Sequence, residues 1–102
     1  MAYLFSYGTL RNVAIQKDLF KRELIGWPDT LLDYALSQEK VYGQYPTISK
    51  VSNASEQLSG MVYEITTQEL NKADAYEGNA YSRILIKLKS RKEAWVYIAE
   101  SS

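Results

Sequence analysis

Helix-start signals are sparse in this sequence, and their sparseness restricts the fold more than any other feature. Asn12 can cap a short helix that runs from residue 13 to about residue 21. Thr66 and Glu69 form a capping box, which predicts a second helix ending near residue 77, where Gly78 supplies a stop. Helices and strands therefore do not alternate along the chain, so a doubly wound parallel sheet is not expected.

Most of the remaining chain reads as short strands. The first, residues 2–7, alternates between aromatic and other side chains. Further strands are predicted at residues 30–37, 46–51, 60–65, 80–89 and 94–99. Residues 26–29 read as a turn and residues 52–57 as a loop. This pattern predicts an α+β fold: a small mixed, mostly antiparallel, partly closed β-barrel of about six strands, with two or more short helices at its rim.

The chain has 102 residues, which predicts a single domain spanning residues 1–102. Lys plus Arg and Asp plus Glu each total 12, so the formal net charge is zero. No general attraction to nucleic acid or to anionic membranes follows from that balance, and we expect neither partner.

The N-terminus lacks a secretory pattern and no apolar stretch approaches ~18 residues, so we expect a cytoplasmic protein. The expected oligomeric state is a monomer or a weak homodimer.

The sequence contains neither Cys nor His. Disulfides, thiolate chemistry, the usual zinc ligand and the Ser-His triad are therefore all excluded. Any catalysis has to use carboxylates, Tyr, Lys, Arg, hydroxyls or backbone groups.

Glu77 is the first candidate for a functional side chain. At about 100° per residue, Leu70, Ala73 and Glu77 fall within roughly 60° of one another on the second predicted helix. Glu77 therefore projects from the apolar side, where burial would raise its pKa toward the range of general acid–base catalysis. The alternative is a carboxylate that reaches solvent at a frayed helix end, or that pairs with Arg83.

The segment Tyr7-Gly8-Thr9-Leu10-Arg11 is the second candidate. A strand that ends in a tight turn just ahead of a helix leaves backbone N–H groups without partners, and the helix dipole adds a positive field. Such a turn can hold a carboxylate or a developing oxyanion, and Gly8 leaves room for a ligand to approach. The alternative is an ordinary strand–helix connection; neither GxGxxG nor a phosphate loop is present.

Taken together, the two segments resemble the gamma-glutamylcyclotransferase-like family. Members carry a Tyr-Gly-[Ser/Thr]-Leu signature after the first strand, and later an Asp-x-x-Glu-Gly-x-x-Tyr-x-Arg segment. The matching positions here are Tyr7, Gly8, Thr9, Leu10, Asp74, Glu77, Gly78, Tyr81 and Arg83. The resemblance spans nearly the whole chain, although residues 25–57 carry no matching motif.

The resemblance implies an enzyme without metal or cofactor that converts a gamma-glutamyl amide to 5-oxoproline and a free amine. The short chain favours a small gamma-glutamyl amine or gamma-glutamyl amino acid as substrate. Glu77 would be the general acid/base, and the turn from Tyr7 to Leu10 would bind the substrate through its backbone amides. Tyr81 and Arg83 would be further substrate-binding residues.

Several alternatives stay open at this stage. Tyr81 could belong to the core, and Arg83 could orient Glu77 or form a structural pair with Asp74. The whole protein could also be a non-catalytic module that keeps the cavity for a small ligand or a partner. A barrel that stacks RNA bases is disfavoured by the neutral charge and by the lack of a dense basic run beyond residues 87–92.

Overall fold

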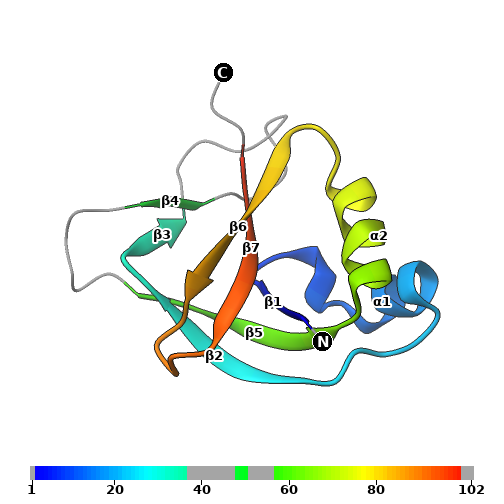
Figure 1. Cartoon of the computed structure of the whole chain (residues 1–102), viewed down its shortest axis with the longest axis horizontal. Helices are drawn as coiled ribbons and strands as arrows, with labels where there is room; N and C mark the ends of the chain where they lie inside the picture. The colour runs from blue at the N-terminus through cyan, green and yellow to red at the C-terminus, as the bar shows by residue number, and fades with distance from the viewer. Residues whose placement is uncertain (1, 37–47, 51–56, 100–102) are drawn as a thin grey trace.

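The computed structural model describes residues 2–36, 48–50 and 57–99 (Figure 1). In chain order the elements are β1 (Ala2–Ser6), the 3-10 helix η1 (Thr9–Arg11), α1 (Val13–Phe20), β2 (Gly26–Leu32), β3 (Tyr34–Leu36), β4 (Ile48–Lys50), β5 (Gln57–Ile65), α2 (Thr67–Glu77), β6 (Tyr81–Lys87) and β7 (Glu93–Ala99). No helix in this described part of the chain is long and apolar enough to cross a bilayer.

Five strands form one sheet in the order β2-β5-β1-β7-β6, and β3 pairs with β4 in a separate two-stranded sheet. The central strand β1 runs parallel to β7 and antiparallel to β5, while the other pairs are antiparallel. The predicted mixed, mostly antiparallel α+β fold is thus confirmed. The sheet is nevertheless open, because β2 and β6 are its two edges and do not pair within the described residues.

The two edges approach each other at the hairpin between β6 and β7. The backbone amide of Lys89 donates to the carbonyl of Thr30 at 2.9 Å, and the Ser90 hydroxyl donates to the Asp29 carboxylate. The Lys92 ammonium lies over the Tyr3 ring, 4.0 Å from its centroid, and 5.1 Å from the Trp27 ring. We call these interactions the hairpin contact; they curl the sheet toward the predicted barrel without closing it.

Hydrophobic residues pack on both faces of the sheet. On β1, Leu4 and Phe5 point to opposite faces, and both are at most 1% exposed. Leu4 belongs to a cluster that includes Leu70 and Ala73 of α2, whereas Phe5 packs with Val96 on the other face. In Figure 1 both helices lie together beside the sheet, away from β3 and β4. The helix-side cluster fixes α2 against the sheet.

Both predicted helices are confirmed. The Asn12 side chain caps α1 by accepting from the backbone amides of Ala14 and Ile15 at 2.8 and 3.3 Å. The Thr66–Glu69 capping box is present at the start of α2. Glu69 also binds Arg22 through two hydrogen bonds of 2.7 and 2.8 Å, which hold the pKa of the Glu69 carboxyl at about 2.

The predicted turn at residues 26–29 is wrong, because these residues begin β2. Pro28 is tolerated there because β2 is an edge strand, where a missing N–H group costs little. Gly26 serves close packing between strands: a Cβ atom at this position would lie 2.6 Å from the carbonyl oxygen of Val62. Pro28 therefore marks an edge strand, and Gly26 marks the close approach of β2 to β5, instead of a turn.

Other strand boundaries also shift. The predicted strand at residues 30–37 is divided at Asp33, whose φ of 68° breaks the extended backbone between β2 and β3. The strand predicted from residue 60 begins earlier, so Gln57 belongs to β5 and not to the predicted loop. The strand predicted at residues 46–51 contains β4, and the rest of that segment and of the 52–57 loop lies outside the described residues.

Candidate functional site

The turn after β1 forms the 3-10 helix η1 and presents free backbone amides. Within the described residues, the amides of Thr9 and Leu10 donate to no protein acceptor, whereas the Gly8 amide donates to Ser6 Oγ at 3.3 Å. The Arg11 guanidinium folds back, and its Nε donates to the Gly8 carbonyl at 3.1 Å. The φ of Gly8 is −130°, so the backbone does not need glycine for a left-handed conformation. Two adjacent N–H groups therefore have no protein acceptor among the described residues.

The side chain of Leu10 lies in the core. It is 2% exposed, and its carbonyl accepts a hydrogen bond of 2.8 Å from Gln16 Nε2. The buried Gln16 side chain also accepts from the Leu24 amide at 2.9 Å. Gln16 thereby fixes the turn to α1 and to the chain entering β2. Its burial was not predicted from the sequence, although Gln16 lies four residues before the buried Phe20 on the same helix face.

Glu77 is the last residue of α2 and is half-buried. Leu70 and Ala73, on the same side of the helix, are buried as predicted. Burial raises the pKa of the Glu77 carboxyl to about 7. Within the described part of the chain, this carboxyl makes no hydrogen bond or ion pair, so the pairing with Arg83 that was one of the alternatives is absent. The group can therefore accept or release a proton near neutral pH.

The turn and the end of α2 lie next to each other. Thr9 Oγ1 and the Tyr76 hydroxyl form an exposed hydrogen bond of 2.9 Å. The Tyr7 hydroxyl donates to the carbonyl of Tyr97 at 2.7 Å, which joins the end of β1 to the end of its parallel neighbour β7. Because Glu77 follows Tyr76 directly, these bonds bring its helix end and the Tyr7–Leu10 turn to the same end of the sheet.

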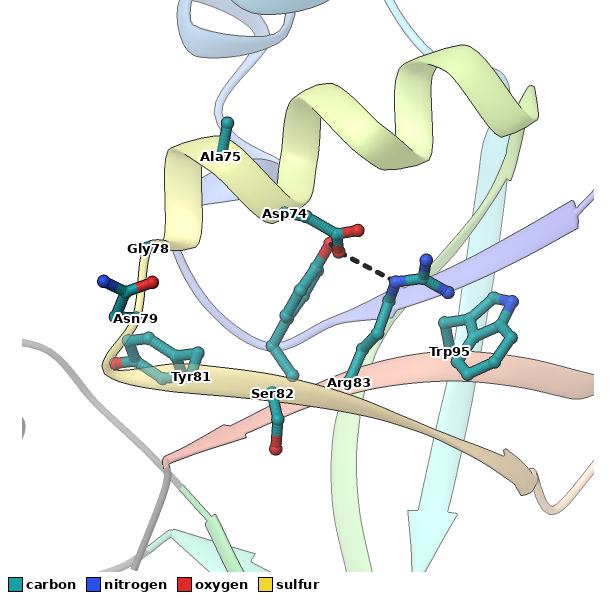
Figure 2. A pocket seen from close by; sticks show the side chains of 9 residues that line it. Asp74, Ala75, Gly78, Asn79, Tyr81, Ser82, Arg83 and Trp95 are labelled. Atoms are coloured by element: carbon teal, nitrogen blue, oxygen red, sulfur yellow. Dashed lines mark hydrogen bonds and ion pairs between the residues drawn. The ribbon is translucent and has the colours of Figure 1, made fainter.

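Arg83 pairs with Asp74, as one of the sequence alternatives proposed. Arg83 Nε lies 2.8 Å from Asp74 Oδ1, and the guanidinium carbon lies 4.4 Å from the centroid of the Trp95 ring (Figure 2). The Tyr97 hydroxyl donates to the same carboxylate oxygen at 2.6 Å. Partial burial favours the neutral form of Asp74, but these two hydrogen bonds outweigh it and lower the pKa of the Asp74 carboxyl. Asp74 is therefore an ionised structural acceptor.

Tyr97 connects this group of residues with Glu77. Its pKa is raised, mainly by burial and then by the hydrogen bond to Asp74, and the negative charge of Glu77 adds to the shift. Tyr97 therefore remains a protonated donor in its hydrogen bond to Asp74. No local sequence pattern marks this residue, because Asp74 and Tyr97 are 23 positions apart and on different elements.

An open pocket of about 850 Å³ lies between the end of α2 and strands β6 and β7 (Figure 2). Of the predicted site residues, Tyr81 and Arg83 line it. Glu77 and the Tyr7–Leu10 turn do not line it, but Gly78, the next residue after Glu77, does. The predicted residues thus gather around the end of α2 in two adjoining places: the turn with Glu77, and the pocket with Arg83.

Several solved structures share this fold. An Arabidopsis thaliana protein matches with a TM-score of 0.81 and 24% identity, over 96% of this chain and 61% of that one. An uncharacterized protein from Pyrococcus horikoshii has a TM-score of 0.73 and 21% identity, over 100% of this chain and 80% of its own. A gamma-glutamyl cyclotransferase matches with a TM-score of 0.77 and 20% identity, over 98% of this chain and 67% of that one. At these identities the likeness shows the fold alone.

This chain spans only 61% of the length of the Arabidopsis protein. No curated protein sequence matches it. The sequence model of one family, described as gamma-glutamyl cyclotransferase, AIG2-like, matches residues 4–102. Because that match covers nearly the whole chain, including both the Tyr7–Leu10 turn and Glu77, the protein belongs to the gamma-glutamyl cyclotransferase, AIG2-like family.

Proposed function

We propose that this protein is a gamma-glutamyl cyclotransferase that converts a small gamma-glutamyl amine or gamma-glutamyl amino acid to 5-oxoproline and a free amine. The observation that carries the proposal is the state of Glu77. A half-buried carboxyl with a pKa of about 7 and no partner among the described residues is suited to proton transfer near neutral pH. Family membership supports the reaction class.

The first step is ring closure within the substrate. The Glu77 carboxylate removes a proton from the substrate's alpha-ammonium group, and the resulting amine attacks the gamma-carbonyl carbon. The free amides of Thr9 and Leu10 bind oxygen atoms of the glutamyl group, either its alpha-carboxylate or the oxygen that becomes negative during attack. Because nucleophile and carbonyl belong to one molecule, positioning supplies much of the rate advantage.

The second step breaks the amide bond. Protonated Glu77 donates its proton to the leaving nitrogen as the bond between that nitrogen and the gamma-carbon breaks. The ring nitrogen passes its extra proton to the released amine, which departs as an ammonium ion, and the neutral lactam remains. One carboxyl group therefore serves both steps, returning to its ionised form.

The test is 5-oxoproline formation from a panel of gamma-glutamyl amines and amino acids, measured by mass spectrometry. We expect turnover by the parent protein, and a loss of at least ~100-fold in kcat/KM for Glu77→Gln, because general acid–base catalysis typically contributes ~10²–10⁴-fold. The matched control is Glu23→Gln, which neutralises an exposed acid that is not among the predicted site residues and should keep full activity.

Equal turnover by Glu77→Gln and the parent protein would exclude Glu77 as the acid/base. Thermal-shift measurements with the same compounds and with 5-oxoproline separate catalysis from binding. Stabilisation by a compound that is never turned over would favour the alternative, a non-catalytic binding module.

A further inference from the structure

Gln16 is a polar residue of α1 whose side chain is buried, with an exposed fraction of 1%. Its Nε2 donates to the Leu10 carbonyl at 2.8 Å, and its Oε1 accepts from the Leu24 amide at 2.9 Å. Exchanging the two ends of the side-chain amide would set N–H against N–H and oxygen against oxygen, so a single orientation satisfies both contacts. An apolar side chain of the same size would leave both backbone groups buried without a partner, which is costly. The position therefore favours a side-chain amide.

Leu10 is the residue of the turn that Gln16 holds. Its amide is one of the two that have no protein acceptor among the described residues. Its side chain is 2% exposed and belongs to the core cluster on the helix side of the sheet. In a helical turn the carbonyl and the amide of one residue point toward opposite ends of the axis. A fixed carbonyl and a fixed side chain therefore determine the direction of the Leu10 amide, toward the start of η1.

The turn needs this support because its other restraints are weak. Helix η1 has three residues, and the Arg11 amide reaches the Gly8 carbonyl at 3.2 Å. A single 3-10 turn has poor hydrogen-bond geometry. The hydrogen bonds of the Thr9 and Arg11 side chains are exposed, so water competes for them. The bond from Gln16 is buried, where the low local dielectric makes it stronger.

The direction of these amides matters for the proposed reaction. Hydrogen-bond donors assist a reaction when they are already aimed at the place where negative charge develops. A displacement of about 1 Å can cost up to ~100-fold in rate. The amides of Thr9 and Leu10 are adjacent in the chain, so a rotation of the backbone at Leu10 would turn both away from the glutamyl group.

From these contacts we propose that Gln16 is a positioning residue, which holds the Leu10 carbonyl so that the amides of Thr9 and Leu10 stay aimed at the glutamyl group of the bound molecule. Gln16 touches no substrate atom in this assignment and acts through the backbone of the turn. The inference rests on the proposed function and adds to it a residue that holds the turn from within the core.

Two substitutions of similar shape test the hydrogen bond. Gln16→Met removes it at every pH, and we expect kcat/KM for 5-oxoproline formation by the full chain to fall about 10-fold or more. Gln16→Glu keeps a donor for the Leu10 carbonyl when the new carboxyl is protonated, and burial favours that form. Tyr63, the neighbouring titratable side chain on β5, stays protonated in this range, because burial raises its pKa above the usual value near 10.

The readout is the activity of each variant divided by that of the parent protein at the same pH, which cancels the titration of Glu77. For Gln16→Glu this ratio should be highest near pH 6 and should fall toward pH 9, whereas for Gln16→Met it should be low and constant. The control is Leu31→Ala, which damages the core cluster on the other face of the sheet. It should stay within about 2-fold of the parent in kcat/KM, because the two sites are independent. Circular dichroism at each pH checks that every protein is folded.

Binding of 5-oxoproline gives a second readout that needs no turnover. This product carries the carboxylate and the carbonyl of the glutamyl group. We expect it to shift the NMR signals of the Thr9 and Leu10 amides in the parent protein, with a Kd about 10-fold higher in Gln16→Met and nearly unchanged in Leu31→Ala.

Three outcomes would overturn the inference. The first is activity of Gln16→Met equal to that of Leu31→Ala while the parent forms 5-oxoproline, which leaves the proposed function intact. The second is a Gln16→Glu ratio that does not change between pH 6 and pH 9. The third is 5-oxoproline that leaves both amide signals of the parent unmoved. Failure of the proposed function alone looks different, because no protein then forms 5-oxoproline although its binding at these amides still depends on Gln16.

Discussion

The carboxyl group of Glu77 has opposite consequences for activity and for stability. Its raised pKa of about 7 keeps a proton acceptor available near neutral pH. The same shift means that ionised Glu77 is less favourable in the folded protein than in the unfolded chain, where its pKa is near 4.5. The folded state binds a proton more tightly in this range, so stability falls as the pH rises from about 4.5 to about 7.

Replacing this residue should therefore stabilise the protein while it abolishes turnover. We expect Glu77→Gln to raise the free energy of unfolding at pH 8 by roughly 1–3 kcal/mol, because Gln mimics the protonated acid without the cost of burying its charge. The gain should shrink as the pH falls through 4.5, because below that value Glu77 becomes protonated in the unfolded chain as well as in the folded protein. Urea unfolding at pH 5 and pH 8 measures this difference, with Glu23→Gln as the exposed control. A gain that does not depend on pH would contradict the assigned cause.

At the residue scale, the spacing of residues within one helix predicted which side chains are buried, but contacts between distant segments could not be predicted from the sequence. The partial burial of Glu77 follows from its position relative to Leu70 and Ala73 on one helix, and it was one of the two readings that the sequence left open. The bond from Tyr97 to Asp74 depends on how β7 packs against α2, which no local pattern encodes. The pairing of Arg83 with Asp74 was one of several alternatives that only the packed structure could separate.

The first turn of α2 is stabilised by a charged pair as well as by its cap. Glu69 accepts the Thr66 amide at 2.9 Å and also binds the Arg22 guanidinium. The Arg22 hydrogen bond is the main reason that the Glu69 pKa is about 2. A depressed pKa adds stability at pH values above the pKa of the unfolded chain, which is near 4.5. This contribution is lost as the pH falls toward 2. The bridge ties α2 to the segment between α1 and β2.

We expect Glu69→Gln to lower the free energy of unfolding at pH 7 by about 1–2 kcal/mol, a figure reduced for the partly exposed Arg22. Gln can still occupy the capping box, so the loss reports the ion pair and not the cap. The difference between variant and parent should disappear as the pH approaches 2, as measured by chemical denaturation across pH. The exposed acid Glu93, changed to Gln, provides the control. A loss that persists unchanged at pH 2 would point to the cap instead.

At the element scale, helices were easier to predict than strands for a physical reason. A capping box is a local set of hydrogen bonds, so the start of α2 could be read from Thr66 and Glu69 alone. The extent of β2 depends on its partner β5, which tolerates Pro28 at the edge and requires Gly26 for close approach. The break at Asp33 depends on a positive φ that the residue type permits but does not dictate.

On the scale of the whole molecule, the hairpin contact decides how far the sheet curls. It joins the edge strand β2 to the β6–β7 hairpin through backbone, carboxylate and cation–π interactions. The sequence predicted a partly closed barrel from strand content, but it could not predict which strands would form the edges. That outcome depends on strand order, which places β2 and β6 at opposite ends of the sheet.

The cation–π part of this contact can be measured separately. Lys92→Gln should lower the free energy of unfolding by about 0.5–1 kcal/mol, because it removes the ammonium group from the rings of Tyr3 and Trp27. Lys87→Gln, an exposed change on β6, should stay within about 0.5 kcal/mol of the parent. Urea unfolding of the three proteins provides the comparison. Equal stability of Lys92→Gln and Lys87→Gln would show that the ring contacts do not contribute.

A sheet held together at one corner deforms unevenly. The β6–β7 hairpin is tied to β2, whereas Tyr81 and Arg83, at the start of β6, lie at the far end of the same strand beside the pocket. Separating the strand start from α2 would break the Arg83–Asp74 salt bridge but none of the bonds at the tied corner. The Arg83–Asp74 salt bridge therefore opposes widening of this rim, to which the hairpin contact does not extend.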